Sequence, residues 1–200
     1  MEKLVLLFLA VFGLSMAQAE PVVGRDAAAG YMGQNSSRST SSSGNHYLAL
    51  HIGKLVSADS WKWGKQEKQK DIGSTTFGLT YRFDQWYTTD LSIRVDFNEY
   101  NIDGKRPQKL SFMPVITFPE AASQFPLYFG MGAGLGVFFK QLSAESSLSF
   151  DYQLIVGIRF FDVFENTGFF LESGLKNHLQ LTDDGQVNAA YIATGALFTF

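Results

Sequence analysis

The chain has 200 residues, a formal net charge of -3 and an isoelectric point near 5.6. This charge leaves no basic excess, which excludes the electrostatic footprint of a nucleic-acid-binding protein. The absence of cysteine excludes disulfide bonds and a lipidated N-terminal cysteine. Aromatic residues make up 15% of the chain, including 19 phenylalanines, which suits a protein whose outer face contacts lipid.

Residues 1–19 have the pattern of a secretory signal peptide. Lys3 is followed by an apolar run from Leu4 to Leu14 and by small residues at Ala17 and Ala19. The run is too short to cross hydrocarbon and an Ala-x-Ala site follows it, so we expect cleavage after Ala19. No later segment approaches the ~20 consecutive apolar residues that a transmembrane helix needs. If the mature chain enters a membrane, it therefore does so as strands.

Residues 20–44 precede the first expected strand. Their second half is a polar, serine-rich stretch that cannot bury enough apolar surface to order itself. We expect a flexible periplasmic segment here, and the alternative is a spacer without a function of its own.

An alternation of apolar and other residues marks the strands. In residues 91–98 every second residue from Leu91 to Phe97 is apolar, and the residues between them are polar. A barrel strand shows apolar residues to lipid and other residues to the lumen at this period. The fold class that we predict over residues 45–200 is all-β, an eight-stranded antiparallel transmembrane β-barrel with up-and-down meander topology. The expected strands are 46–56, 76–83, 91–98, 109–118, 127–140, 148–160, 168–180 and 188–200.

An even number of strands places both ends of the barrel chain on one side, which we expect to be periplasmic. The periplasmic turns are then 84–87, 119–126 and 162–166, and the outer connections are 57–72, 101–107, 141–147 and 181–187. Aromatic side chains at the periplasmic strand ends are expected to form a girdle at the headgroup boundary. They are Trp86, Tyr87, Phe118, Phe125, Tyr128, Phe160, Phe161, Phe164 and Phe169. The rival fold is a soluble lipocalin-like barrel, in which the apolar side chains would point inward.

The residues assigned to the lumen include four positive and three negative charges. They are Arg82, Arg94, Asp96, Asp151, Arg159, Glu172 and Lys176. Isolated charges in a narrow barrel would be costly to desolvate, so we expect them to pair and to fill the lumen. The alternative is an ion path through the barrel.

A glycine-rich segment, residues 130–136, permits two interpretations. Glycine-rich loops cradle phosphates where a strand turns into a helix. Here glycine recurs at every second position and no helical pattern follows. We therefore expect a strand whose glycines leave room for bulky side chains opposite.

The three histidines, His46, His51 and His178, belong to no metal-binding motif, and we expect neither a metal nor another cofactor. His178 lies late on the seventh expected strand, on the lumen parity, with Tyr191 as an expected neighbour.

Residues 110–115, 126–137 and 146–150, together with Gly157, resemble the middle strands of outer-membrane lipid A 3-O-deacylases of the PagL type. The resemblance covers roughly the second half of the mature chain. In that family a His-x-Ser pair and a downstream glutamate form a serine-hydrolase triad at the outer-leaflet rim. His178 matches the histidine and is the candidate catalytic residue, but Gln180 occupies the serine position and no glutamate follows Gly185.

Two functions remain open. The first is a non-catalytic barrel, structural or in contact with lipopolysaccharide or another partner through its outer loops. Cations expected in those loops could meet lipid phosphates, although Asp59, Glu67 and Asp71 lie among them and ordinary solvated charges are the alternative. They are Lys62, Lys65, Lys68, Lys70, Lys105 and Arg106. The second is a hydrolase acting on acyl chains, with His178 as the base; the amide of Gln180 is not a usable nucleophile.

The last residues, Ala196 to Phe200, end an alternating strand in an aromatic residue. Phe198 and Phe200 fall on the lipid face and resemble the signal read by the outer-membrane assembly machinery. We therefore expect a monomer in the outer membrane of a Gram-negative bacterium, in contact with membrane lipid, lipopolysaccharide and that machinery.

Overall fold

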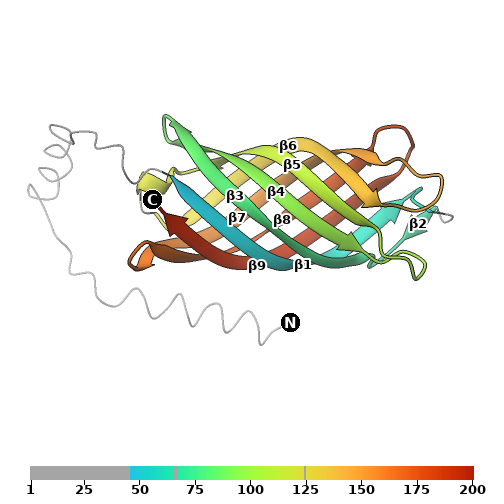
Figure 1. The fold of residues 1–200 in the computed structure, drawn as a ribbon, viewed down its shortest axis with the longest axis horizontal. Helices are drawn as coiled ribbons and strands as arrows, with labels where there is room; N and C mark the ends of the chain where they lie inside the picture. The colour runs from blue at the N-terminus through green and yellow to red at the C-terminus, as the bar shows by residue number, and fades with distance from the viewer. Residues whose placement is uncertain (1–45, 65–66, 124) are drawn as a thin grey trace, which may run out of the picture. The chain divides into compact units, whose positions relative to one another are not determined.

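The computed structural model describes residues 46–64, 67–123 and 125–200. The expected signal peptide and serine-rich segment lie outside these residues. The described chain is almost entirely β-structure (Figure 1). The elements are β1 (Tyr47–Trp61), β2 (Lys68–Gln69), β3 (Gly73–Trp86), β4 (Thr89–Tyr100), β5 (Gln108–Phe118), the short 3-10 helix η1 (Ala121–Ser123), β6 (Leu127–Lys140), β7 (Leu148–Phe164), β8 (Thr167–Gln180) and β9 (Gln186–Thr199).

The strands form a closed antiparallel barrel. β1 pairs with β3, each strand from β3 to β8 pairs with the next, and β9 pairs back with β1. β2 adds only a two-residue extension to the end of β1, where Ser60 lies opposite Gln69. The predicted eight-stranded up-and-down barrel is therefore confirmed. Among the described residues, no helix is long and apolar enough to cross a membrane.

The connections between the strands lie at the two ends of the barrel. At one end, called here the turn end, are residues 87–88, 119–123, 125–126 and 165–166, together with the C-terminus (Figure 1). The opposite end, called the loop end, carries residues 62–64, 67–72, 101–107, 141–147 and 181–185. Two turn-end connections have only two residues, as expected, but the third, 119–126, is longer than three of the four loop-end connections.

Several strands are longer than the alternation predicted. β1 continues from Val56 to Trp61, and β7 continues from Phe160 to Phe164. In β1 the register against β9 shifts between Val56 and Asp59, and Ser57 has a positive φ of 49°. This bulge interrupts the side-chain period while the backbone ladder continues beyond it. The alternation of apolar and polar residues marks only the part of a strand whose outer face contacts lipid. The hydrogen-bonded strand is longer, so the alternation predicts strand ends that are too early.

The two faces of the barrel wall differ in polarity. The outward side chains are apolar and exposed, such as Ile52, Phe112 and Leu154, whereas Arg94, Asp96 and Lys176 are buried inside. This orientation excludes the soluble lipocalin-like alternative and is the one that a transmembrane barrel requires. Leu197 is buried inside, whereas Phe198 and Phe200 are exposed on the outer face, as expected.

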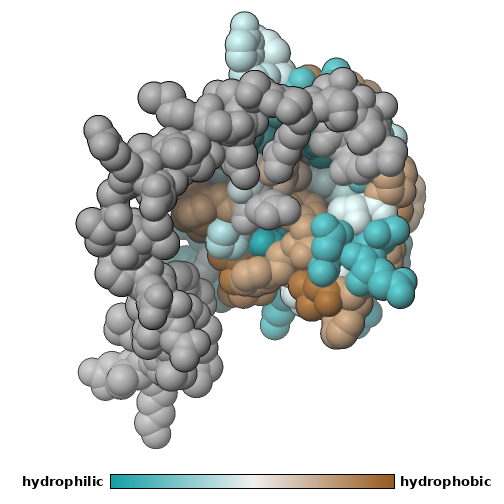
Figure 2. Space-filling model, turned by 90° about the vertical axis from the view of Figure 1, so that its left-hand side faces the viewer, coloured by the Kyte–Doolittle hydropathy of each residue, from teal (hydrophilic) through white to brown (hydrophobic). Residues whose placement is uncertain are grey.

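The aromatic side chains at the turn end are mostly exposed, as a girdle requires. Trp86, Phe118 and Phe164 are among them. At this end apolar residues reach the rim beside polar ones (Figure 2). Two members of the expected girdle point elsewhere: Tyr128 is buried in the lumen, and Phe161 packs against Tyr47 with ring centroids 5.6 Å apart.

The glycine-rich segment forms the middle of β6, with its glycines on the lumen side. A Cβ atom on Gly134 would lie 2.1 Å from the carbonyl oxygen of Phe112, and one on Gly132 would lie 2.8 Å from Cγ2 of Val115. These glycines therefore give room to the side chains of β5, as the strand interpretation predicted.

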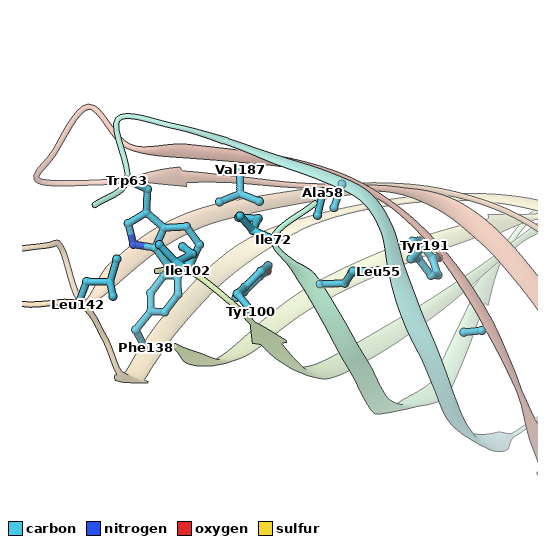
Figure 3. Packing of buried hydrophobic residues seen from close by; sticks show 12 residues of the cluster. Leu55, Ala58, Trp63, Ile72, Tyr100, Ile102, Phe138, Leu142, Val187 and Tyr191 are labelled. Atoms are coloured by element: carbon cyan, nitrogen blue, oxygen red, sulfur yellow. The ribbon is translucent and has the colours of Figure 1, made fainter. Parts of the chain in front are cut away.

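An apolar cap, formed mainly by buried side chains, fills the loop end of the lumen. Trp63 is fully buried, and its indole ring packs among Ile102, Phe138 and Leu142 (Figure 3). Its ring centroid lies 5.2 Å from that of Tyr100 in an edge-to-face arrangement. Because loop residues supply Trp63, Ile72, Ile102 and Leu142, three connections are fixed to the barrel interior.

Candidate functional site

The lumen contains three charged layers, and the first lies near the turn end. Asp90 accepts a hydrogen bond from Arg82 Nε at 2.7 Å and one from Arg159 Nη1 at 3.2 Å. The backbone N–H of Ala121 donates to the same carboxylate at 2.8 Å. Arg159 Nη2 also donates to the carbonyl of Pro119 at 2.5 Å. This layer therefore ties the 119–126 connection to the barrel wall.

The second layer crosses the middle of the barrel. Arg94 pairs with Asp96 at 3.0 Å and with Glu172 at 2.5 Å, and Lys176 pairs with Asp96 at 2.6 Å. The hydroxyls of Tyr128 and Tyr191 donate to Glu172 at 2.9 and 3.1 Å. Each carboxylate thus has several donors, which is the condition for a buried ion pair to be tolerated.

The third layer surrounds His178 beneath the apolar cap. Asp151 contacts Lys109 Nζ at 2.7 Å and His178 Nδ1 at 3.0 Å, and it accepts a hydrogen bond from Ser149 Oγ at 2.7 Å. The other ring nitrogen of His178 faces the hydroxyl of Tyr100, rather than that of Tyr191 as we expected. Lys109 Nζ also contacts His178 Nδ1.

All seven charges assigned to the lumen from the sequence lie in these layers. The structure adds Asp90 and Lys109, and it brings His51 within 3.1 Å of Asp96. Asp90 was missed because the alternation was traced only from Leu91, although Asp90 has the parity of Ser92. Lys109 was missed because no face was assigned to the first residue of its strand.

Little space remains inside the barrel. Between the first and second layers lies a cavity of about 30 Å³, lined among others by Tyr47, Arg94 and Glu172. A cavity of this size holds no more than a few water molecules. The cavity therefore offers no room for a solute of substrate size.

Gln180, which occupies the serine position of the resemblance, belongs to the cap. With its amide oriented to satisfy its neighbours, its nitrogen donates to Glu145 at 3.1 Å, and its oxygen accepts from the Trp63 indole at 3.0 Å. Glu145 also accepts the backbone N–H of Gly64 at 2.8 Å. The indole N–H of Trp63 also lies 3.0 Å from Gln141 Oε1, so both glutamines border Trp63, and His178 beneath them is only 3% exposed.

The cations assigned to the outer loops fall into two groups. Lys62 pairs with Asp184 at 3.1 Å, and Lys68 pairs with Asp59 at 3.6 Å, while Lys70 is exposed beside Asp71. Lys105 and Arg106 instead border an open cavity of about 320 Å³ together with Lys140. Lys65 lies outside the described residues.

Within the part of the chain that the structure describes, no group of three or more histidine, aspartate or glutamate side chains has an arrangement that could hold a metal ion. The charged side chains of the lumen are paired with one another, whereas some neutral polar side chains, such as Asn98 and Gln153, have no hydrogen-bond partner among the described residues.

Comparison with known proteins shows the fold. No protein-family model matches the chain, and no curated protein matches its sequence. Among solved structures it is similar to the outer membrane protein AlkL in lipid bilayers, with a TM-score of 0.52 and 14% identity over 82% of this chain and 94% of that chain. The chain therefore has the fold of the small outer-membrane β-barrels.

Two further structures of this kind are similar. The outer membrane protein OprG from Pseudomonas aeruginosa has a TM-score of 0.49 and 13% identity, and covers 79% of this chain and 97% of its own. The outer membrane enzyme PagL has a TM-score of 0.45 and 17% identity, and covers 74% of this chain and 97% of its own.

Proposed function

We propose that the chain is a non-catalytic protein of the bacterial outer membrane, whose lumen is closed by its own side chains and whose loop end faces outward. The observation that carries this proposal is the closure of the lumen at two levels. Charged layers fill its length, and the apolar cap around Trp63 covers its loop end. A barrel filled in this way acts through its surfaces and does not pass solutes.

Conductance in planar bilayers tests the closed lumen. We expect the purified protein, inserted and folded, to give no stable channels of porin size. The positive control is a porin reconstituted in the same way, since its open lumen gives stable channels under the same conditions. Stable channels of porin size in the unaltered protein would refute the closed-lumen proposal.

One arrangement favours a second function, a hydrolase acting on acyl chains at the outer leaflet. Asp151 contacts His178 Nδ1, as the carboxylate of a catalytic triad does, and Ser149 lies on the same carboxylate. Against this function, the Ser149 hydroxyl donates to Asp151, and the other nitrogen of His178 faces Tyr100. Both Ser149 and His178 are also buried, so an ester group has no access to them.

Mass spectrometry of lipid A from cells with and without the protein separates the two functions. We expect an unchanged acyl-chain pattern, both with the unaltered protein and with His178→Ala. Loss of one acyl chain that depends on His178, and that Ser149→Ala also abolishes, would establish the hydrolase in place of the proposal.

The proposal also includes a monomer whose exposed Phe198 and Phe200 are recognised by the outer-membrane assembly machinery. Its support is the exposed position of both rings on the outer face, with Phe198 in the closing strand β9 and Phe200 directly after it. Deleting Phe200 should lower the amount of folded barrel in the membrane, measured by heat-modifiable gel mobility, whereas Phe164→Leu, at an exposed ring on the same rim, should not.

A further inference from the structure

We propose that Lys105, Arg106 and Lys140 form one binding site for the phosphate groups of an outer-leaflet lipid such as lipopolysaccharide. This inference rests on the proposed function, because it requires that the loop end faces outward. It narrows the lipid contact to three residues and adds Lys140, which lies at the end of β6.

The distribution of ion pairs among the cationic side chains identifies Lys105, Arg106 and Lys140 as this site. Among the described residues, five cationic side chains take part in no ion pair: Lys54, Lys70, Lys105, Arg106 and Lys140. The last three are exposed and border the same open cavity, which is lined further by Gly104, Pro107, Gln141 and Leu142. No carboxylate belongs to that lining, whereas Lys54 shares its cavity with Asp71. The three cations therefore give an excess positive charge that an anion would balance.

The backbone that carries Lys105 and Arg106 is fixed before any lipid arrives. Asp103 and Gly104 both have positive φ, 49° and 74°, and form a two-residue turn in which Ile102 and Lys105 exchange hydrogen bonds of 2.9 and 2.8 Å. Ile102 is fully buried in the apolar cap. Pro107 closes the segment, since its carbonyl accepts the N–H of Tyr100 at 3.0 Å.

The segment with Lys140 is anchored in the same cap. Leu142 is buried there, and Gln141 Nε2 donates to the carbonyl of Ser146 at 2.7 Å. Both backbones are thus held by apolar anchors while their cationic side chains point outward. A site built in this way loses less conformational entropy on binding than one on unanchored loops.

The neighbouring wall identifies the anion as a lipid phosphate. Phe139, next to Lys140, is 59% exposed on the outer face, and its ring centroid lies 5.6 Å from that of Phe97. Leu110, four residues after Arg106, is also exposed on that face. An acyl chain on this apolar wall places its headgroup at the level of the three cations, where charge-assisted hydrogen bonds to phosphate form.

The test measures retention of lipid A by the full-length protein in nanodiscs, with native mass spectrometry as the readout. The site variant is Lys105→Gln with Arg106→Gln and Lys140→Gln. The control is Lys62→Gln with Lys68→Gln and Lys70→Gln, which removes the same charge from the other loop. We expect the site variant to retain bisphosphorylated lipid A at least about tenfold more weakly, the factor of one charge-assisted hydrogen bond, and the control to be unchanged.

Three outcomes would overturn the inference. They are equal retention by both variants, equal retention of lipid A with and without its phosphates, and displacement of lipid A by inorganic phosphate at the same concentration. The last outcome would indicate a site for free phosphate. Heat-modifiable mobility of each protein is measured in parallel, so a barrel that fails to insert counts against the proposed function and is distinguished from a folded barrel that does not bind.

Discussion

Asp90 is the carboxylate that joins both arginines of the first charged layer. It receives hydrogen bonds from two buried arginines and from the backbone N–H of Ala121. Neither arginine can lose its charge, so removing the carboxylate leaves two buried cations without a counterion. Removing Asp90 alone is enough to cause this loss of stability, because Arg82 and Arg159 have no other carboxylate among their contacts in the described chain.

Asp90→Asn should therefore lower the free energy of unfolding by about 3–5 kcal/mol, the usual cost of breaking a buried ion pair. The measurement is urea unfolding of the purified barrel in detergent, followed by intrinsic fluorescence. Asp184→Asn is the matched control. Its carboxylate pairs with Lys62 at the surface, so its removal should change the free energy of unfolding by less than about 1 kcal/mol. Equal effects of the two changes would contradict the importance of burial.

At the scale of elements, β6 shows why small residues alternate along a wall strand. Its glycines face β5 and β7, where Met113, Val115 and Asp151 occupy the space that a Cβ atom would need. On its lumen face the strand therefore contributes few side-chain contacts of its own and leaves room for the side chains of its neighbours.

Gly134→Val should prevent most of the chain from reaching the folded state, because its Cβ would lie 2.1 Å from a backbone oxygen that cannot move without breaking the sheet. Ala133→Val is the control, since Ala133 is exposed on the outer face of the same strand. The fraction of membrane protein with heat-modifiable mobility distinguishes them. Normal folding of the Gly134 variant would show that β5 can shift.

The strands and their two faces could be predicted because the wall is a two-sided surface and the alternation records it directly. Strand ends and loops could not be predicted in this way. From the sequence, Trp63 is predicted to lie in a loop. Its packing against Ile102 and Phe138 becomes visible only in the closed barrel. In the sequence, Gln180 is noticed only because it occupies the serine position of the resembling family. In the structure, its side chain lies beside Glu145. Both depend on contacts between distant loops, which have no local pattern.

At the scale of the whole molecule, the orientation across the membrane is a prediction that the cysteine-free sequence makes easy to test. Ser143 lies exposed at the loop end and Asn166 at the turn end. In intact cells, a thiol reagent that does not cross the membrane should label Ser143→Cys and leave Asn166→Cys unlabelled. Both variants should be labelled after the membrane is opened. The reverse pattern in intact cells would show that the loop end faces the periplasm.

The closing seam between β1 and β9 also has a kinetic consequence. Tyr47 lies opposite Thr199 and Trp61 opposite Gln186, so this seam joins the most distant parts of the described chain. Such high contact order slows folding, because the entropy of closing a long loop is lost before the contacts form. Until then the two edge strands expose unpaired N–H and C=O groups that can pair with other chains. Folding yield should therefore fall as protein concentration rises, even though the finished barrel has no free edge.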